Sequence, residues 1–150
     1  MKKLDYDKIK FFGKNIYNFC GRFKIKKPFI VKPDKRYRTT TAEVLSGRNR
    51  KTGKKGYIIK YNPKEISGLE YWKINYVVLH ELGHVKTKQS GNEFDREYRA
   101  EKFAHDMIKK HFQPDYPKYC KYISWYIDFA KDDIYKKAFI KLSKKLKRNR

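Results

Sequence analysis

The chain has 150 residues, a common length for one domain, and its 13 Tyr, 10 Phe and 2 Trp supply bulky side chains for a core. Its 39 Lys and Arg against 16 Asp and Glu give a formal net charge of +23, which attracts nucleic acid, anionic membranes or acidic proteins. No apolar stretch approaches the roughly 18 residues that a bilayer span needs, so we expect no transmembrane segment.

The N-terminus and the cysteines predict a cytoplasmic protein. The chain begins with a basic stretch, as a secretory signal peptide would, but Asp5 and Asp7 interrupt any apolar segment behind it. Cys20 and Cys120 are too few and too far apart for a disulfide scaffold or a thiolate zinc site. We therefore expect a single cytoplasmic domain over residues 1–150, with both thiols reduced.

The first part of the chain predicts a helix followed by strands. Apolar residues at helical spacing predict an amphipathic helix over residues 4–22. A short extended segment follows, in which Pro28 and Pro33 oppose a helix. Residues 36–62 then change to a β pattern, in which YRTTTAEVLS and GYIIKYN are two strand candidates. The glycine-rich, basic stretch 47–56 between them is the expected hairpin loop.

The middle of the chain predicts two long helices. Ser67 and Glu70 fit a capping box, which begins a helix that we expect to end near Lys86. Asn92 is expected to cap a second helix, which ends near Phe112, before two prolines.

The C-terminal part, about residues 118–150, predicts a basic helical segment with helices over 118–131 and 133–147. Residues 136–150 carry eight basic residues and no acidic one. The simplest interpretation of the last helix is one apolar stripe packed on the core with a solvated face. The order of elements predicts an α+β fold, with a small antiparallel β-hairpin or sheet packed on a mainly helical body.

A motif for metal chemistry lies in the helix that ends near Lys86. Residues 80–84 read H-E-L-G-H, an HExxH motif. His80 and His84 are one helical turn apart, so both imidazoles can reach one metal ion. Glu81 lies about 100° around the helix, where its carboxylate can act as a general base. Zinc (Zn²⁺) suits two imidazoles and can lower the pKa of a bound water to about 7.

Small residues suggest that another helix packs closely against this motif. Gly83 lies inside the helix, where glycine costs about 1 kcal/mol relative to alanine. Ala100 and Ala104 lie on the next helix, beside a polar stripe. We therefore expect the two helices to approach each other closely at these positions.

The polar stripe on the next helix offers a third ligand, which a catalytic zinc site requires. Glu97, Glu101 and His105 follow one another at four-residue spacing. Glu97 is the expected third ligand, and Glu101 is expected to accept the free ring N–H of a ligating histidine. His105 is the alternative third ligand. A solvated helix face is the alternative for both glutamates. His105 and Tyr98 are candidates for stabilising the oxyanion of the reaction.

H-E-L-G-H followed by E-x-x-A-E-x-F-A resembles the gluzincin metallopeptidases, and most of all the ImmA/IrrE family carried by phages, mobile elements and bacteria. The resemblance covers about residues 36–112. It implies a zincin-like body, zinc held by His80, His84 and Glu97, Glu81 as the base, and a supporting role for Glu101. Glu101 stands where that family more usually has Asn or Asp.

These observations predict a zinc-dependent endopeptidase that acts on an intracellular protein, and the resemblance favours a DNA-bound regulator of a phage or mobile element. The basic loop 47–56 and the tail 136–150 are the expected contacts with nucleic acid. The strand at 57–61 is a candidate edge for an extended substrate, with an ordinary hairpin strand as the alternative.

Two other functions remain open. One is a basic nucleic-acid-binding protein with a structural metal site and no protease activity. The other is a basic effector or toxin that acts on membranes or partners after release by lysis.

Overall fold

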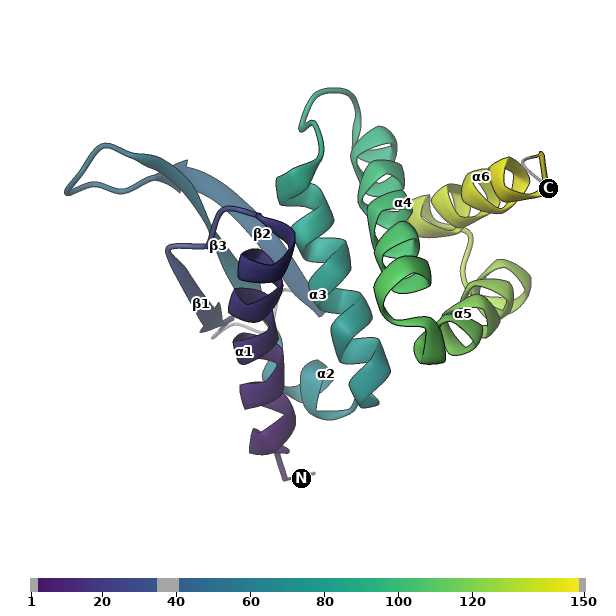
Figure 1. Ribbon diagram of the computed structural model, residues 1–150, viewed down its shortest axis with the longest axis horizontal. Helices are drawn as coiled ribbons and strands as arrows, with labels where there is room; N and C mark the ends of the chain where they lie inside the picture. The colour runs from purple at the N-terminus through teal and green to yellow at the C-terminus, as the bar shows by residue number, and fades with distance from the viewer. Residues whose placement is uncertain (1–2, 35–40, 149–150) are drawn as a thin grey trace.

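The computed structural model describes residues 3–34 and 41–148, and it shows the predicted α+β fold: a small sheet beside a mainly helical body (Figure 1). Helix α1 (Tyr6–Phe23) begins where the Asp5 side chain accepts a hydrogen bond from the backbone N–H of Lys8 at 3.2 Å. Its apolar face is buried against the core. The helix predicted for residues 4–22 is confirmed. The buried residues of α1 are Phe12, Ile16, Phe19 and Cys20.

The sheet has three strands in the order β1-β3-β2, with β1 at Ile30–Pro33, β2 at Ala42–Arg48 and β3 at Lys55–Tyr61. The predicted hairpin is confirmed, because β2 and β3 pair in antiparallel register. The extended segment before it adds a strand, since β1 pairs in parallel with β3. Residues 36–40, at the start of the predicted hairpin region, lie outside the described residues.

The prediction of a free edge at residues 57–61 is wrong. Strand β3 is central, with β1 on one side and β2 on the other. The sequence shows the extended character of residues 30–33 but not their parallel partner, because β3 lies more than 20 residues further along the chain. Within the described residues, the unpaired edge nearest the HExxH helix belongs to β2.

The predicted capping box at Ser67 and Glu70 is also wrong. Asn62 caps a short helix α2 (Pro63–Ser67) instead, because its side chain accepts from the next backbone N–H groups and proline suits the first helical position. Ser67 therefore ends a helix rather than beginning one, and its hydroxyl accepts from the backbone N–H of Asp5 at 2.9 Å. Glu70 precedes the long helix and accepts the indole N–H of Trp72 at 2.7 Å.

Four further elements complete the chain. They are α3 at Tyr71–Lys86, α4 at Glu93–His111, α5 at Tyr116–Phe129 and α6 at Ile134–Arg148, with one 3₁₀ turn at Gln113–Asp115. The cap at Asn92 is confirmed, because its side chain accepts from the backbone N–H of Asp95 at 2.9 Å. The helices predicted near 118–131 and 133–147 are confirmed with small shifts at their ends.

Helix α3 occupies the middle of the molecule, with α1 and the sheet on one side and α4 on the other (Figure 1). All of its residues from Ile74 to Gly83 are buried or half-buried. Helix α6 packs on α4 through an apolar stripe that includes Ala138 and Leu142, as predicted. Among residues 3–34 and 41–148, no helix has both the length and the apolar character for crossing a lipid bilayer.

Helices α3 and α4 approach each other most closely at Gly83. A Cβ atom at this position would lie 2.8 Å from the carbonyl oxygen and 3.0 Å from the Cα of Ala100. Because both atoms belong to backbone, α4 would have to move to admit it. Ala100 and Ala104 are themselves fully buried. The close approach expected from these small residues is confirmed.

We predict that Gly83→Ala lowers the free energy of unfolding by about 1–3 kcal/mol, the usual cost of overpacking a dense contact. The matched control is Gly13→Ala in α1, where a Cβ meets nothing within 4 Å. It should raise the same quantity by about 0.5–1 kcal/mol, because alanine is the better helix former. Urea unfolding of both variants makes the comparison. Equal stabilisation by the two changes would contradict the close contact.

Candidate metal centre

The two helices in contact bring His80, His84 and Glu97 together. The two histidines lie one turn apart on α3, and Glu97 faces them from α4. The Nε2 atom of His80 lies 2.9 Å from one carboxylate oxygen of Glu97, and the Nε2 atom of His84 lies 3.2 Å from the other. One ligand atom from each residue lies within 4.8 Å of the other two. In the part of the chain that the structure describes, no other group of three potential ligands is this close.

These spacings fit a metal ion. Ligand atoms that surround zinc tetrahedrally at about 2.0–2.2 Å stand roughly 3.3–3.6 Å from one another. The observed separations lie close to that range, and two imidazoles with a carboxylate form a donor set typical of catalytic zinc. The side chains of His84 and Glu97 keep 15% and 13% exposure, so the centre is open to solvent on one side. A water or a substrate therefore has a route to it.

Glu101 contacts the ring nitrogen of His80 that does not contact Glu97. The Nδ1 atom of His80 lies 2.6 Å from Oε1 of Glu101, whose side chain is buried. The hydroxyl of Tyr119 donates to Oε2 of the same carboxylate at 3.0 Å, and the hydroxyl of Tyr76 donates to Oε1. A carboxylate in this position accepts, so Nδ1 of His80 carries a proton, and the neutral ring would then offer the lone pair of Nε2 to a metal ion. This arrangement is the one expected for Glu101.

The centre concentrates negative charge. Burial raises the pKa of Glu81 to about 8, with the neighbouring glutamates adding to the rise and the charge of His80 opposing it. Burial works against ionisation of Glu97 as well, but hydrogen bonds from His80 and His84 lower its pKa to about 2. Burial disfavours the charged form of His80, yet the carboxylates of Glu101 and Glu97 raise its pKa well above the ordinary value. The same carboxylates that favour a protonated imidazole would stabilise a bound cation.

A cavity of about 310 Å³ opens beside the centre. It lies between α3, the start of β2, α5 and α6. Residues His80 and Glu81 form part of its wall, so a molecule in the cavity would reach both the ligand and the carboxylate. Aromatic side chains dominate the opposite wall. They are Tyr122 and Tyr126 from α5 and Tyr135 and Phe139 from α6.

The structure does not bring His105 to the centre. Its Nδ1 lies 3.0 Å from Oδ1 of Asp106 and its Nε2 lies 3.0 Å from the hydroxyl of Tyr116. The reason is distance along the helix, because eight residues carry the chain about 12 Å from Glu97. His105 therefore has partners of its own and does not belong to the ligand group.

Tyr98 also lies away from the centre. Its ring is buried between α4 and α6, where it packs with Ala138 and Leu142. Its hydroxyl is buried and, among the residues that the structure describes, has no hydrogen-bond partner. Tyr98 follows Glu97 by about 100° around the helix, which turns it toward α6 rather than toward α3. The packing of Tyr98 against α6 therefore gives no support to Tyr98 as the oxyanion donor.

Two tyrosines that line the cavity have their rings beside His80. The ring centroid of Tyr76 lies 6.2 Å from that of His80, but its hydroxyl donates to Glu101. The ring centroid of Tyr135 lies 6.4 Å from that of His80. Asp133 fixes this end of α6, since it accepts from the backbone N–H of Lys136 at 2.8 Å and from the hydroxyl of Tyr126 at 2.6 Å. Burial, followed by the charge of nearby carboxylates, raises the pKa of Tyr135, so its hydroxyl keeps its proton at neutral pH.

The sequence carries no signal that distinguishes Tyr135 among 13 tyrosines, because only the packing of α6 brings it near His80. No protein-family model, curated protein or solved structure matches this chain. The resemblance to the ImmA/IrrE family stays a hypothesis, and the centre rests on its own geometry.

We predict that the purified protein binds one equivalent of zinc, and that His80→Ala and Glu97→Ala each lose it. Each change removes one of the three grouped donors. His105→Ala is the matched control, because it removes an imidazole outside the group and should keep the metal. Metal content after dialysis, measured by mass spectrometry on folded protein, gives the answer. Loss of zinc in His105→Ala and retention in Glu97→Ala would move the centre elsewhere.

Proposed function

We propose that this chain is a zinc-dependent metallopeptidase that hydrolyses peptide bonds of a protein substrate. One observation carries the proposal: Glu81, a carboxylate outside the ligand group, is buried beside it and lines the cavity that opens there. A structural metal site needs ligands only. A carboxylate that faces both the centre and a substrate-sized cavity is what hydrolysis requires.

Each residue of the centre would have its own role in peptide hydrolysis. His80, His84 and Glu97 would hold the zinc ion, and Glu101 would orient His80. Bound zinc would supply Lewis-acid chemistry, polarising the groups that react. Glu81 would accept the proton of the attacking water on its carboxylate and then deliver it to the nitrogen of the leaving amine. Burial raises the pKa of Glu81 in the metal-free chain, and the positive charge of a bound ion would oppose that rise and favour the carboxylate form, which accepts a proton.

The start of β2 would position the substrate. Thr41 and Ala42 line the cavity together with His80 and Glu81. One edge of β2 pairs with β3, and within residues 3–34 and 41–148 no strand pairs with its other edge. An extended peptide can add to such an edge through backbone hydrogen bonds, which would hold it beside Glu81 whatever its side chains.

The substrate named by the ImmA/IrrE resemblance, a DNA-bound regulator, belongs to the same proposal and rests on that resemblance alone. The competing function, a nucleic-acid-binding protein with a structural metal, is separated from this one by Glu81. A structural metal site gives no role to a buried carboxylate beside the ligands.

We predict that Glu81→Gln abolishes peptide cleavage and leaves zinc bound. The amide keeps the size of the side chain but cannot take a proton from water. The zinc-loaded proteins are incubated with a proteome-derived peptide library, and new peptide ends are identified by mass spectrometry. The wild type should produce ends that the variant does not. A variant that generates the same ends at the same rate would end the peptidase proposal.

We propose Tyr135 as the residue that stabilises the oxyanion, because its ring lies beside His80 and lines the cavity. We predict that Tyr135→Phe lowers kcat about 10²–10³-fold with little change in zinc content, the usual effect of removing one oxyanion donor. Tyr98→Phe is the control. It should leave kcat unchanged and should not destabilise the protein, because the buried hydroxyl that it removes has no partner. Steady-state cleavage of one peptide from the library compares the two. Equal rates for Tyr135→Phe and the wild type would remove Tyr135 from the reaction.

A further inference from the structure

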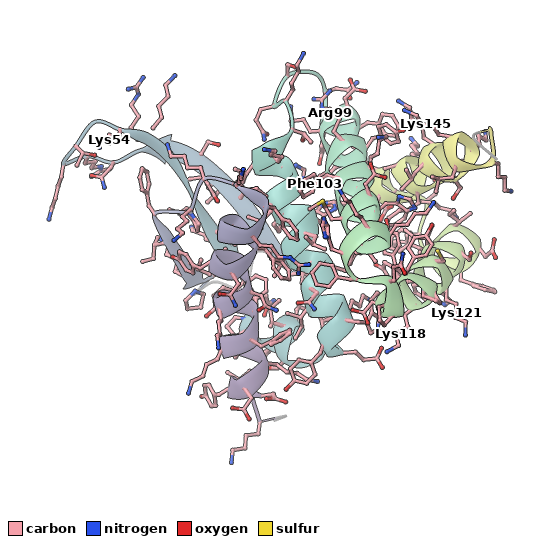
Figure 2. All side chains as sticks on the ribbon, viewed as in Figure 1. Lys54, Arg99, Phe103, Lys118, Lys121 and Lys145 are labelled. Atoms are coloured by element: carbon pink, nitrogen blue, oxygen red, sulfur yellow. The ribbon has the colours of Figure 1, made fainter. Side chains whose placement is uncertain are left out.

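A second candidate site lies on the β2–β3 hairpin, which extends far from the helical body (Figure 1). Residues 48–55 at its end carry five cations and no acidic residue. All five are exposed, and Lys54 stands at the far end of the hairpin (Figure 2). They are Arg48, Arg50, Lys51, Lys54 and Lys55. In the described part of the chain, no carboxylate forms an ion pair with any of them.

Two of these cations oppose each other across the strands. Arg48 pairs in register with Lys55, a position at which like charges destabilise a hairpin. A third cation lies beside this pair, because Nζ of Lys26 donates to the carbonyl oxygen of Lys55 at 2.6 Å. Arg48 donates to the carbonyl oxygen of Gly53 at 3.2 Å. Among the described residues, the hydrogen bonds of these cations go to neutral carbonyl groups, so no carboxylate offsets the three positive charges that the fold brings together.

The three cations line one groove of about 490 Å³ between the hairpin and the end of α3. Its floor is apolar and includes Val44, Tyr57 and Val85, and no acidic residue lines it. Since side chains alternate along a strand, Val44 and Arg48 lie on the face of β2 that also carries Ala42 at the metal cavity. The groove and the metal cavity are separate. The same face of β2 borders both of them, at different positions along the strand.

Hydrogen bonds hold the turn that carries the remaining cations, Arg50, Lys51 and Lys54, in one conformation. The side chain of Asn49 accepts from the backbone N–H groups of Lys51 at 2.8 Å and Thr52 at 3.3 Å. Gly53 adopts φ +69°, a conformation that suits glycine, and its N–H donates to the carbonyl of Asn49 at 2.8 Å. The cations of the hairpin are therefore presented on an ordered two-stranded ribbon.

We propose that this ribbon and groove bind the phosphate backbone of duplex nucleic acid. An ordered two-stranded ribbon fits the major groove of a duplex, and arginine and lysine are the residues that pair with phosphate. The composition favours nucleic acid over a membrane surface, because residues 48–55 include no apolar side chain that could enter a bilayer. The proposal does not depend on peptidase activity.

The test is binding of a 30-base-pair DNA duplex, followed by fluorescence anisotropy over a range of NaCl concentrations. If the six cations of the hairpin and groove each contact one phosphate, the log of the binding constant should fall against log salt with a slope of about −5. Replacing Arg48, Lys54 and Lys55 by glutamine together should reduce that slope by about 2.7 and weaken binding at least about tenfold at 0.1 M salt.

The matched control replaces Lys118, Lys121 and Lys145 by glutamine, which removes the same charge from the opposite side of the molecule (Figure 2). It should weaken binding less than about threefold, because it alters only the overall field. It also tests the tail 136–150, through Lys145. Equal losses in the two triple variants would overturn the proposal, since binding would then follow net charge alone.

Two further measurements exclude unfolding of the hairpin variant and a link to catalysis as explanations of the binding loss. The hairpin variant should melt no lower than the wild type, because it removes a pair of opposed like charges. Glu81→Gln should bind the duplex as the wild type does, which separates this site from catalysis. Tighter, hairpin-dependent binding to phosphatidylserine vesicles than to DNA would instead assign the surface to membranes and overturn the proposal.

Discussion

The contact between α3 and α4 at Gly83 is the constraint on which the candidate centre depends. Without a Cβ at Gly83, the backbone of Ala100 lies against α3, and the residues just before Ala100 are carried to the histidines. This contact sets Glu97 within 3.2 Å of both imidazoles and places the buried carboxylate of Glu101 behind His80. In a chain with net charge +23, three glutamates, Glu81, Glu97 and Glu101, thus lie together where a bound cation would offset their charge. Five exposed cations lie far from this centre, at residues 48–55 on the end of the hairpin.

The part of the centre that the sequence predicts lies on two neighbouring helices, where spacing decides which side chains share a face. His80, Glu81 and His84 follow from one helical turn, and Glu97 and Glu101 from the next helix together with the small residues that let it approach. Each of these side chains lies where local periodicity placed it. The roles of metal ligand and base assigned to them remain proposals that the geometry supports.

The parts that the sequence did not predict depend on packing between distant segments. Tyr135 reaches the cavity because α6 packs against α4 and α5, and the sequence does not distinguish it from the other tyrosines before that packing is known. Tyr98 and His105 share a helix with Glu97, but neighbouring helices and the length of α4 direct them elsewhere. Strand β1 turned β3 from an edge into a central strand, which moves the site for an extended substrate to β2. At Ser67, a stronger cap five residues earlier, Asn62 before Pro63, took precedence.

The most direct test of the account is a crystal structure of the zinc-loaded protein, with anomalous scattering recorded on both sides of the zinc absorption edge. We predict one peak that appears only above the edge, at about 2.0–2.2 Å from Nε2 of His80, Nε2 of His84 and a carboxylate oxygen of Glu97. His80 should still direct Nδ1 to Glu101, and Glu81 should not be a ligand. A well-ordered protein with no peak among these three residues, or with its zinc held by another set, would contradict the account.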